Sequence, residues 1–496
     1  MGVFPTEYFI GLEPLRFLFI WVIVSEGTGT FRQRFAQTLK HWWPYLLIWL
    51  GNAAWLAYFY TVGTYDSYNV EVASEPMTLL QLPLMMLDAL WKAGIYAWGQ
   101  IIFLVANTIT APSSLLTLGL IGVTFILLLP YFTKLDLSSA DSRAFAIPAL
   151  LIGVVGILLG RIPSFAAGLP LKLQSSFDRF MISMMLGASI FIVGLIELFI
   201  GNVRIKTYVF ALLIALGIGQ QFFNANIFRR DWMQQQEIYS QLGWRIPALE
   251  PNTLLLTDQL PLDYETDISF TAPINWLYAP EYTRSNLPYA MMYTAIRLGG
   301  ASLPALEKNI MINVGIRTVW FHGSTSQAVV IYVPKNGCLR VLDPAQGDQH
   351  TYEGESPFLV DAIPLSDPER IAIDSNETPR LAFLSELDHT WCYYYSKAEL
   401  AHQQKDWNAV INLIDEALAL GYVPENSFEW LSYIEAQAMI GNFEAAEKMT
   451  DDLLAHEKGI RKGLCQVWKR VQAQGPAGND LKSRESQIIS TLQCVQ

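Results

Sequence analysis

The first 223 residues consist mostly of long apolar blocks, whereas polar and apolar residues are mixed over short distances in the rest of the chain. Six blocks are each close to the roughly 20 apolar residues that a helix needs to cross a bilayer, and they lie near 8–24, 43–60, 114–131, 144–160, 181–200 and 207–223. With a less regular segment at 77–110, they predict an α-helical multi-pass membrane domain of about seven spans over residues 1–223.

The segment 77–110 admits more than one interpretation. Its roughly 34 residues are mostly apolar but include Asp88 and Lys92, which are four apart and can form an ion pair on one helix face. The segment is either one span preceded by an interfacial helix or a tight helix pair that returns to the side where it began.

This choice decides which side of the membrane carries the soluble part. A single crossing makes the soluble part cytoplasmic, with eight cations inside and four outside. A return makes it external, with five cations outside and seven inside: Arg32, Arg34, Lys40, Lys134, Arg143, Arg204 and Lys206. Cytoplasmic loops carry an excess of Lys and Arg, so the count leans to the single crossing without deciding between the two.

Residues 224–375 predict a small soluble α/β domain. Short strand patterns lie at 253–257, 318–322, 328–333 and 339–342, with a helix near 287–298. The dipeptide Asn336-Gly337 favours the positive backbone angles of a type I′ turn and predicts a hairpin between the last two strands. Acids near strand ends, where a binding site can form, are more often simply solvated; they are Asp258, Asp263, Asp267 and Asp343.

Residues 376–496 predict a helical tail. Two successive stretches each have the pattern of a helical hairpin, with the turn pairs Asp406-Trp407 and Asn442-Phe443 placed alike. The spacing resembles the tetratricopeptide repeat, although the expected glycine is replaced. Because two hairpins are fewer than the roughly three repeats that an array needs, we expect them to pack on the α/β domain or on a protein partner.

The charge is unevenly divided between the two parts. Residues 1–223 hold 12 Lys and Arg against 11 Asp and Glu, whereas the remainder holds 21 against 34. A soluble part that is this acidic repels nucleic acid, so nucleic-acid binding is excluded as a function class.

All four cysteines lie in the soluble part and lack the paired spacing of a zinc site, so no metal site is expected from them. Buried free thiols are the favoured interpretation. The alternative, for an oxidising compartment, is a disulfide between Cys392 and Cys465.

Charged residues of the membrane part are the candidates for chemistry. Glu13 and Arg16 fall within the first span and are expected to face other helices or a watery cavity. The loop 161–180 carries Arg161, Lys172 and Arg179, which could hold a phosphate headgroup because guanidinium groups match its oxygens. The alternative is that these cations only anchor the helix ends at headgroup level.

The stretch RQRFAQTLKHWWPYLLIWLGNAAWLAYF, the loop ending in FDRF and a soluble domain after the last span together resemble a known family. Over about residues 8–240, the chain is similar to the C-terminal part of bacterial membrane glycosyltransferases of the GT-C superfamily, of the family 39 type. The resemblance implies transfer of a sugar from a polyprenyl-phosphate donor to an acceptor outside the cytoplasmic membrane. A carboxylate would act as base, and cations or a divalent metal would stabilise the departing phosphate.

In that family the carboxylate lies in the first external loop, but here the loop after the first span is basic and holds only Glu26. Either the chain is a shortened or inactive relative, or another acid has taken over. The catalytic candidates are Glu13, Asp66 and Asp178, with Glu71 and Glu75 near Asp66; the substrate-binding candidates are Arg16, Arg161, Lys172 and Arg179.

The leading hypothesis is therefore a glycosyltransferase-related protein of the bacterial cytoplasmic membrane whose soluble domains lie outside the cytoplasm. It needs no cofactor beyond a divalent metal if it is catalytic. Its expected partners are membrane lipid and a polyprenyl-phosphate sugar. The competing hypothesis is a non-catalytic membrane scaffold that presents the α/β domain and the helical tail for protein binding.

Overall fold

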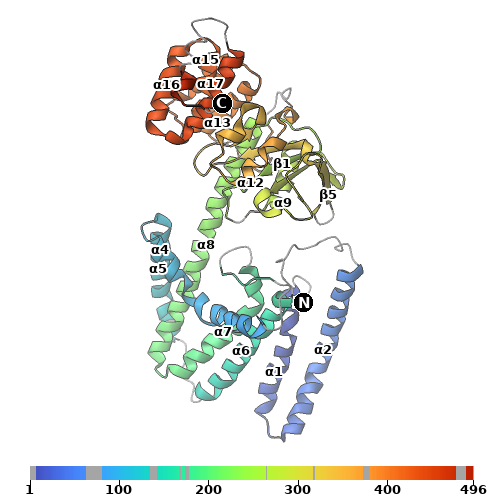
Figure 1. Ribbon diagram of the computed structural model, residues 1–496. Coiled ribbons are helices and arrows are strands. Elements are labelled where there is room, and N and C mark those ends of the chain that lie inside the picture. The colour runs from blue at the N-terminus through green and yellow to red at the C-terminus, as the bar shows by residue number, and fades with distance from the viewer. Residues whose placement is uncertain are drawn as a thin grey trace. The chain divides into compact units, whose positions relative to one another are not determined.

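The computed structural model describes residues 7–62, 81–134, 142–166, 169–173, 178–263, 265–316, 319–372, 379–385, 387–475 and 488–494 (Figure 1). The candidate Asp66, like Glu71 and Glu75, lies outside these residues. The chain divides into two compact units, Met1–Arg230 and Asp231–Gln496, and each is described by itself.

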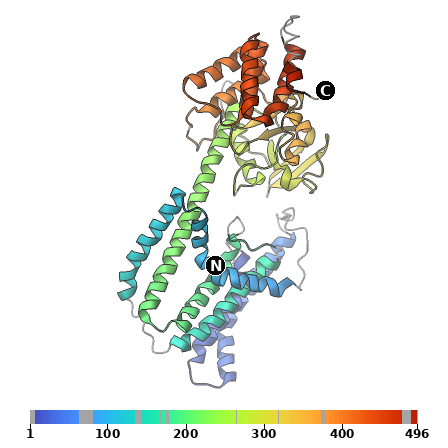
Figure 2. The ribbon, with the colours of Figure 1, turned by 60° about the vertical axis from the view of Figure 1, so that its left-hand side comes forward.

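Unit 1 is built from helices (Figure 2). They are α1 (Glu13–Ser25), α2 (Phe31–Val62), α3 (Leu82–Trp91), α4 (Ala97–Asn107), α5 (Pro112–Lys134), α6 (Ser142–Ala166), α7 (Ile182–Phe199) and α8 (Val203–Arg245), whose last residues belong to unit 2. Short 3₁₀ turns at Glu7–Leu12 and Asp178–Met181 precede α1 and α7.

Within the described residues, five helices are long and apolar enough to cross a membrane. They are Leu82–Asn107, Pro112–Lys134, Ala144–Phe165, Asp178–Phe199 and Val203–Arg245. The predicted spans at 8–24 and 43–60 are helical but are not among these five, so the expected number of about seven stays a prediction. The first belongs to a helix of 13 residues, and the second is rich in Trp and Tyr, which lower its hydropathy.

The ambiguous segment 77–110 contains one continuous helix rather than a tight pair. A π-helical turn, Lys92–Tyr96, joins α3 to α4 without a break. The predicted ion pair is confirmed, with Lys92 Nζ 2.8 Å from the Asp88 carboxylate. Lys92 also donates to the carbonyl of Leu171, at 3.0 Å, which fixes this part of the helix beside the segment that follows α6.

The helices α6 and α7 pack antiparallel with their backbones in close contact. Gly156 faces Gly187, and a Cβ atom on Gly187 would lie 2.4 Å from the backbone nitrogen of Ile157. A Cβ on Gly160 would lie 2.5 Å from the carbonyl oxygen of Ser183. Small residues allow this approach, which membrane helices use because lipid supplies no hydrophobic drive for their association.

Unit 2 contains two small sheets. The larger has the order β3-β1-β6-β7, with β3 (Tyr289–Tyr293) and β6 (Ala328–Tyr332) parallel to β1 (Thr253–Thr257), and β7 (Arg340–Leu342) antiparallel to β6. The smaller has the order β2-β5-β4, from Asn286–Leu287, Val319–Ser324 and Met311–Ile316. All five residues of β1 are buried, as expected for a parallel strand covered on both faces.

Two local predictions in the α/β domain are wrong. The helix expected near 287–298 is mostly β3, followed only by the short α10 (Thr294–Arg297). The strands β6 and β7 do pair, but residues 333–339 separate them and only Gly337 of the predicted turn has a positive φ, so the turn is not type I′. The helix α9 (Asp267–Tyr278) was not predicted, and short helices at Asp348–Thr351 (α11) and Pro357–Val360 (α12) complete the domain.

The tail consists of helices in antiparallel succession. They are α13 (Trp391–Gln403), α14 (Trp407–Ala419), α15 (Leu431–Met439), α16 (Phe443–His456) and α17 (Arg461–Gln474). The carboxylate of Asp406 caps α14 by accepting from the backbone of Ala409 at 3.0 Å. The two predicted hairpins are therefore present as helices, whereas the tetratricopeptide assignment stays a prediction.

Two disulfides hold unit 2 together. Cys338, in the loop between β6 and β7, pairs with Cys392 in α13, and Cys465 in α17 pairs with Cys494. The predictions of free thiols and of a bond between Cys392 and Cys465 are both wrong. Cys465 pairs with Cys494, 29 residues further along the chain, which the spacing of the four cysteines does not reveal.

Candidate functional site

The pair of charges predicted in the first span is internally neutralised. Arg16 Nε lies 3.0 Å from the carboxylate of Glu13, one helical turn away. The Arg16 guanidinium also lies 4.4 Å from the centre of the Tyr45 ring in α2. Arg16 thus connects α1 to α2, and Glu13 pairs with it within α1.

The cations of the loop 161–180 are not gathered into a single site. Arg161 is only 1% exposed and donates to Ser164 Oγ at 2.7 Å and to the carbonyl of Leu169 at 2.9 Å, so its side chain fixes the end of α6. Lys172, Asp178 and Arg179 are exposed. A headgroup that needs all three cations would have to draw Arg161 out of its buried contacts.

Among the acids singled out near strand ends, Asp267 has a structural role. Its carboxylate accepts two hydrogen bonds from Arg297, both at 2.8 Å, and one from the backbone of Tyr293 at 3.1 Å. The backbone of Asp263 donates to Asp231 at 2.8 Å. Asp343, at the end of β7, instead lines a cavity.

This polar cavity lies within unit 2 and has a volume of about 110 Å³. Its walls come from the end of α8, from β7 and the residues after it, and from α13, α15 and α17. Charged side chains of both signs dominate its lining: Arg245, Arg340, Asp343, Asp348, Glu399, His402, Glu435 and Arg470. Such a lining is unusual for a buried cavity, because buried charges are costly unless they are paired.

One wall of the polar cavity is a tight ionic cluster. Glu435 accepts from Arg470 Nε at 2.8 Å and lies 3.0 Å from His402 Nε2. Burial disfavours the Glu435 carboxylate, but the hydrogen bonds from Arg470 and His402 outweigh it and lower its pKa to about 2. Burial likewise opposes the charge on His402, yet the bond to Glu435 raises the His402 pKa above its usual value.

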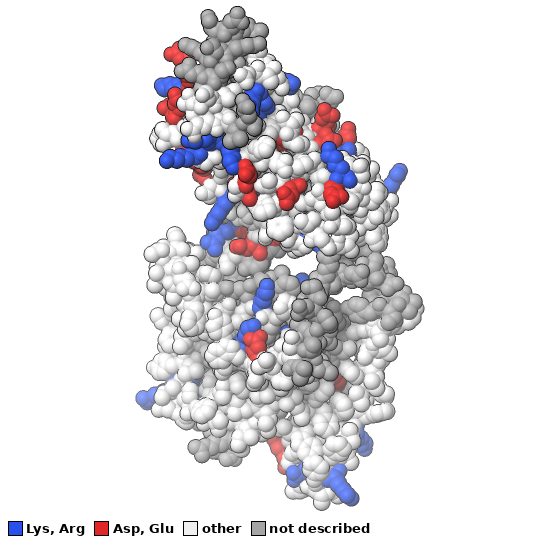
Figure 3. All heavy atoms as spheres, in the orientation of Figure 1, with Lys and Arg blue, Asp and Glu red and all other residues white. Residues whose placement is uncertain are grey.

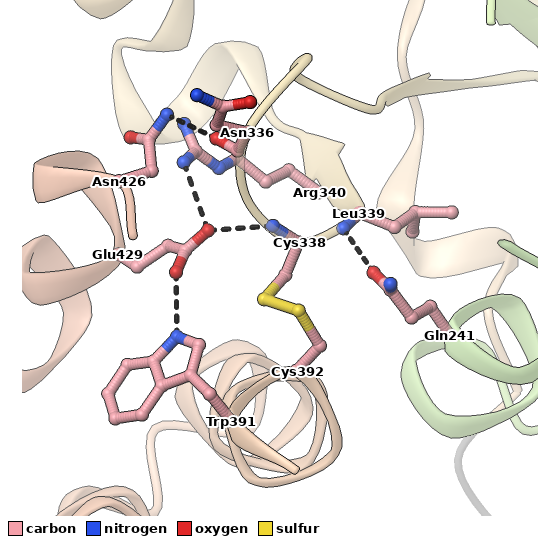
Figure 4. The surroundings of a disulfide bond; sticks show 9 residues. All are labelled: Gln241, Asn336, Cys338, Leu339, Arg340, Trp391, Cys392, Asn426 and Glu429. Atoms are coloured by element: carbon pink, nitrogen blue, oxygen red, sulfur yellow. Dashed lines mark hydrogen bonds and ion pairs between the residues drawn. A yellow bond between two sulfur atoms is a disulfide. The ribbon is translucent and has the colours of Figure 1, made fainter. Parts of the chain in front are cut away.

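The disulfide Cys338–Cys392 and its surroundings lie behind Arg340, one of the residues that line the cavity (Figure 4). The fully buried Glu429 accepts from the backbone of Cys338 at 2.7 Å and from Trp391 Nε1 at 2.6 Å. Its carboxylate also lies 3.5 Å from Arg340, which donates to the hydroxyl of Tyr352 at 3.1 Å. The charge of Arg340 is therefore balanced from behind the cavity wall.

Two acids of the lining, Asp343 and Asp348, lie next to each other. The carboxylate of Asp348 accepts from the backbone of Asp343 at 2.7 Å, and burial raises the Asp348 pKa to about 7. Asp343 accepts from the backbone of Ala345 at 2.8 Å, and burial raises its pKa as well. Both acids accept hydrogen bonds from backbone amides, one before and one at the start of α11.

Sequence reasoning identified only Asp343 among the residues of this cavity. The others are spread from Arg245 to Arg470, so no short motif contains them. One signal was present: Glu435 interrupts the buried face of α15, where its neighbours Tyr433, Ile434 and Ala436 are also buried. A carboxylate at such a position indicates an ionic partner from another element.

No protein-family model matches the chain, and no curated protein or solved structure matches it either. Over the residues that the structure describes, no three His, Cys, Asp or Glu side chains are grouped so that they could hold a metal ion. The functional interpretation therefore depends on the geometry of the two units.

Proposed function

We propose that the protein is a multi-pass membrane protein that holds unit 2, as a disulfide-bonded binding domain, on the extracytoplasmic side of a bacterial cytoplasmic membrane. The long apolar helices α5, α6, α7 and α8 support the membrane anchor. On the face drawn in Figure 3, charged side chains are sparse over the helices of unit 1, as lipid-facing surfaces require.

The observation that carries the orientation is the presence of two disulfides in unit 2. Disulfides form and persist in oxidising compartments and are rare in the cytosol. Because all four cysteines of the chain are paired, the whole of unit 2 has the character of a domain outside the cytoplasm.

The path of the chain through unit 1 supports the same side. The helix Leu82–Asn107 has Lys92 bonded to Leu171, beyond the end of α6. Val105, near the end of this helix, packs in one apolar cluster with Phe223. Phe223 lies about 30 Å along α8 from its first residue, Val203, at 1.5 Å per residue. Lys92, in the middle of the helix, and Val105, near its end, thus both contact segments on the side where α8 leaves unit 1.

A helix that lies along this side without crossing leaves the soluble part on the same side as the return arrangement of the segment 77–110, although no helix pair is formed. That arrangement gives seven cations inside and five outside, with the soluble part external. The charge bias remains in the usual direction, so this orientation obeys the preference of cytoplasmic loops for Lys and Arg.

Binding is favoured over catalysis because the membrane-side candidates serve internal contacts. Glu13 is paired with Arg16, and Arg161 is bonded to Ser164 and Leu169. The relationship to GT-C glycosyltransferases stays a prediction of the resemblance. Turnover of a polyprenyl-phosphate sugar that is abolished by Arg179→Ala would favour it over a non-catalytic scaffold.

Labelling of single introduced cysteines tests the orientation. Glu281 is exposed in unit 2, and Gly201 is exposed between α7 and α8 on the opposite side of unit 1 from Leu171. We expect a membrane-impermeant maleimide to label Glu281→Cys in intact cells and Gly201→Cys only after permeabilisation. The wild type, whose cysteines are all paired, serves as the unlabelled control. The reverse labelling pattern would refute the external orientation.

A further inference from the structure

Arg245, at the end of α8, is a buried cation without a carboxylate partner. Its side chain lines the polar cavity and is only 3% exposed. It donates from Nη1 to the amide oxygen of Gln403 at 2.9 Å, while its Nε has no hydrogen-bond partner among the described residues. Glu399 and Asp343 act on it electrostatically, but neither pairs with it directly, so the guanidinium has lost its hydration without a hydrogen-bonded anion.

The same cavity contains acids without a cation partner. Among the described residues, neither Glu399 nor Asp343 forms an ion pair within 4.0 Å, whereas Glu435 in the lining and Glu429 behind Arg340 both do. Glu399 acts electrostatically on Arg245, His402 and Arg470, which places it centrally among the cavity cations. The cavity therefore offers one cation and two acids that lack a direct ion-pair partner.

The space between these groups is large enough for a small molecule. A single water needs about 10–15 Å³ of accessible cavity volume. The accessible volume of this cavity is about 110 Å³. It holds several waters or one organic molecule of a few heavy atoms. This volume fits a small solute better than a peptide or a sugar-lipid.

We propose that the polar cavity binds a small free amino acid as its zwitterion, with the carboxylate on Arg245 and the ammonium on Glu399 and Asp343. A zwitterion supplies an anion and a cation in one molecule without changing the net charge of the cavity. A simple anion would satisfy Arg245 but would bring further negative charge beside two acids. A simple cation would leave Arg245 unpaired.

This inference goes beyond the proposed membrane display, because it depends only on unit 2 and not on which side of the membrane unit 2 faces. Failure of the labelling experiment would leave the cavity unaffected, and failure of ligand binding would leave the orientation unaffected. The two proposals are thus tested separately.

The test compares matched solutes on the full-length purified protein in detergent by calorimetry and by thermal unfolding. Glycine, L-alanine and L-serine carry both charges, N-acetylglycine lacks the ammonium, and ethylamine lacks the carboxylate. We expect at least one amino acid to bind and to raise the melting temperature, with each singly charged analogue at least about tenfold weaker, or about 1.4 kcal/mol.

A matched pair of variants assigns the binding to the cavity. Glu399→Gln keeps the size of the side chain and removes its charge, and we expect it to weaken binding at least about tenfold. Glu353→Gln removes an equivalent charge from an exposed pair with Lys462, 58% exposed and outside the cavity, and leaves binding unchanged.

Three outcomes would overturn the proposal. They are the absence of binding by all three amino acids at about 10 mM, binding of N-acetylglycine as tight as that of glycine, and unchanged binding by Glu399→Gln. The comparison of solutes needs only the wild type, so it decides the matter even if Glu399→Gln does not fold.

Discussion

Asp348 illustrates how burial changes the chemistry of a single side chain in unit 2. Its carboxylate accepts a backbone hydrogen bond from Asp343, yet desolvation still raises its pKa from 3.8 to about 7. The folded protein therefore holds a proton that the unfolded chain releases at lower pH. Stability from this group is full below about pH 4, is lost as the pH rises through 7, and does not return above it.

We predict that Asp348→Asn removes this loss. The variant should match the wild type near pH 4 and exceed it at pH 8, by at most about 1.4 kcal/mol for each unit by which the pKa differs. Urea unfolding of both proteins, measured from pH 4 to pH 8, gives the comparison. The contribution of His402 is common to both proteins and cancels in the difference between their free energies of unfolding. If the two free energies change with pH in the same way, the raised pKa of Asp348 is contradicted.

At the residue scale, the sequence predicted the contacts that are local. Asp88 and Lys92 were paired correctly because four residues on a helix bring two side chains together. The polar cavity was missed because Arg245, Glu435 and Arg470 meet only after the sheet and the tail have packed. Pairing over such separations depends on tertiary structure, which no spacing rule contains.

Among the elements, α6 and α7 depend most on the absence of side chains. Gly187 faces the backbone of Gly156 and Ile157 at distances where a Cβ atom does not fit. A larger residue there must push the two helices apart and remove their close packing over several turns.

We therefore expect Gly187→Leu to destabilise unit 1 by about 1–3 kcal/mol or more, through overpacking. Gly122→Leu, in α5, is the matched control, because a Cβ atom on Gly122 meets nothing within 4 Å. Size-exclusion chromatography after heating in detergent should show early loss of the monodisperse peak only for Gly187→Leu. Equal loss for both variants would mean that the glycine contact is not what limits stability.

At the element scale, long apolar helices were easier to predict than short strands. The helices at 144–160, 181–200 and 207–223 needed only length and composition, which the sequence contains. The type I′ turn failed because the loop 333–339 is fixed from outside, by Asn426 bonded to the carbonyl of Asn336 and by the disulfide at Cys338. Tertiary contacts of this kind override local turn preference.

For the whole molecule, the disulfide Cys338–Cys392 links the sheet to the tail across 54 residues. We predict that Cys338→Ala with Cys392→Ala lowers the free energy of unfolding of unit 2 by about 2–5 kcal/mol, because the unfolded chain gains freedom. Chemical unfolding followed by tryptophan fluorescence measures the change. Cells lysed in an alkylating reagent should yield wild-type protein with no modified cysteine until a reductant is added; modification without reductant would contradict the bond.

At this scale, the division into an apolar N-terminal part and an acidic C-terminal part was visible in the composition, whereas the disulfide pairing was not. Four cysteines allow three pairings, and only the folded positions of α13 and α17 select one. The side of the membrane was also undecided by charge counts. The pairing, together with the path of Leu82–Asn107, is what now favours the external side.

The bond between Cys338 and Cys392 also restricts how copies of this chain can associate. Proteins with hinged terminal segments can exchange them with a neighbour, each copy lending its segment to the other. Here the disulfide links α13, the first helix of the tail, to the loop between β6 and β7 of its own chain. Glu429 accepts hydrogen bonds from the backbone of Cys338 and from Trp391, next to Cys392. An exchange of α13 between two copies therefore requires this disulfide to break. While the bond is formed, we expect copies to associate through their surfaces rather than by exchanging the tail.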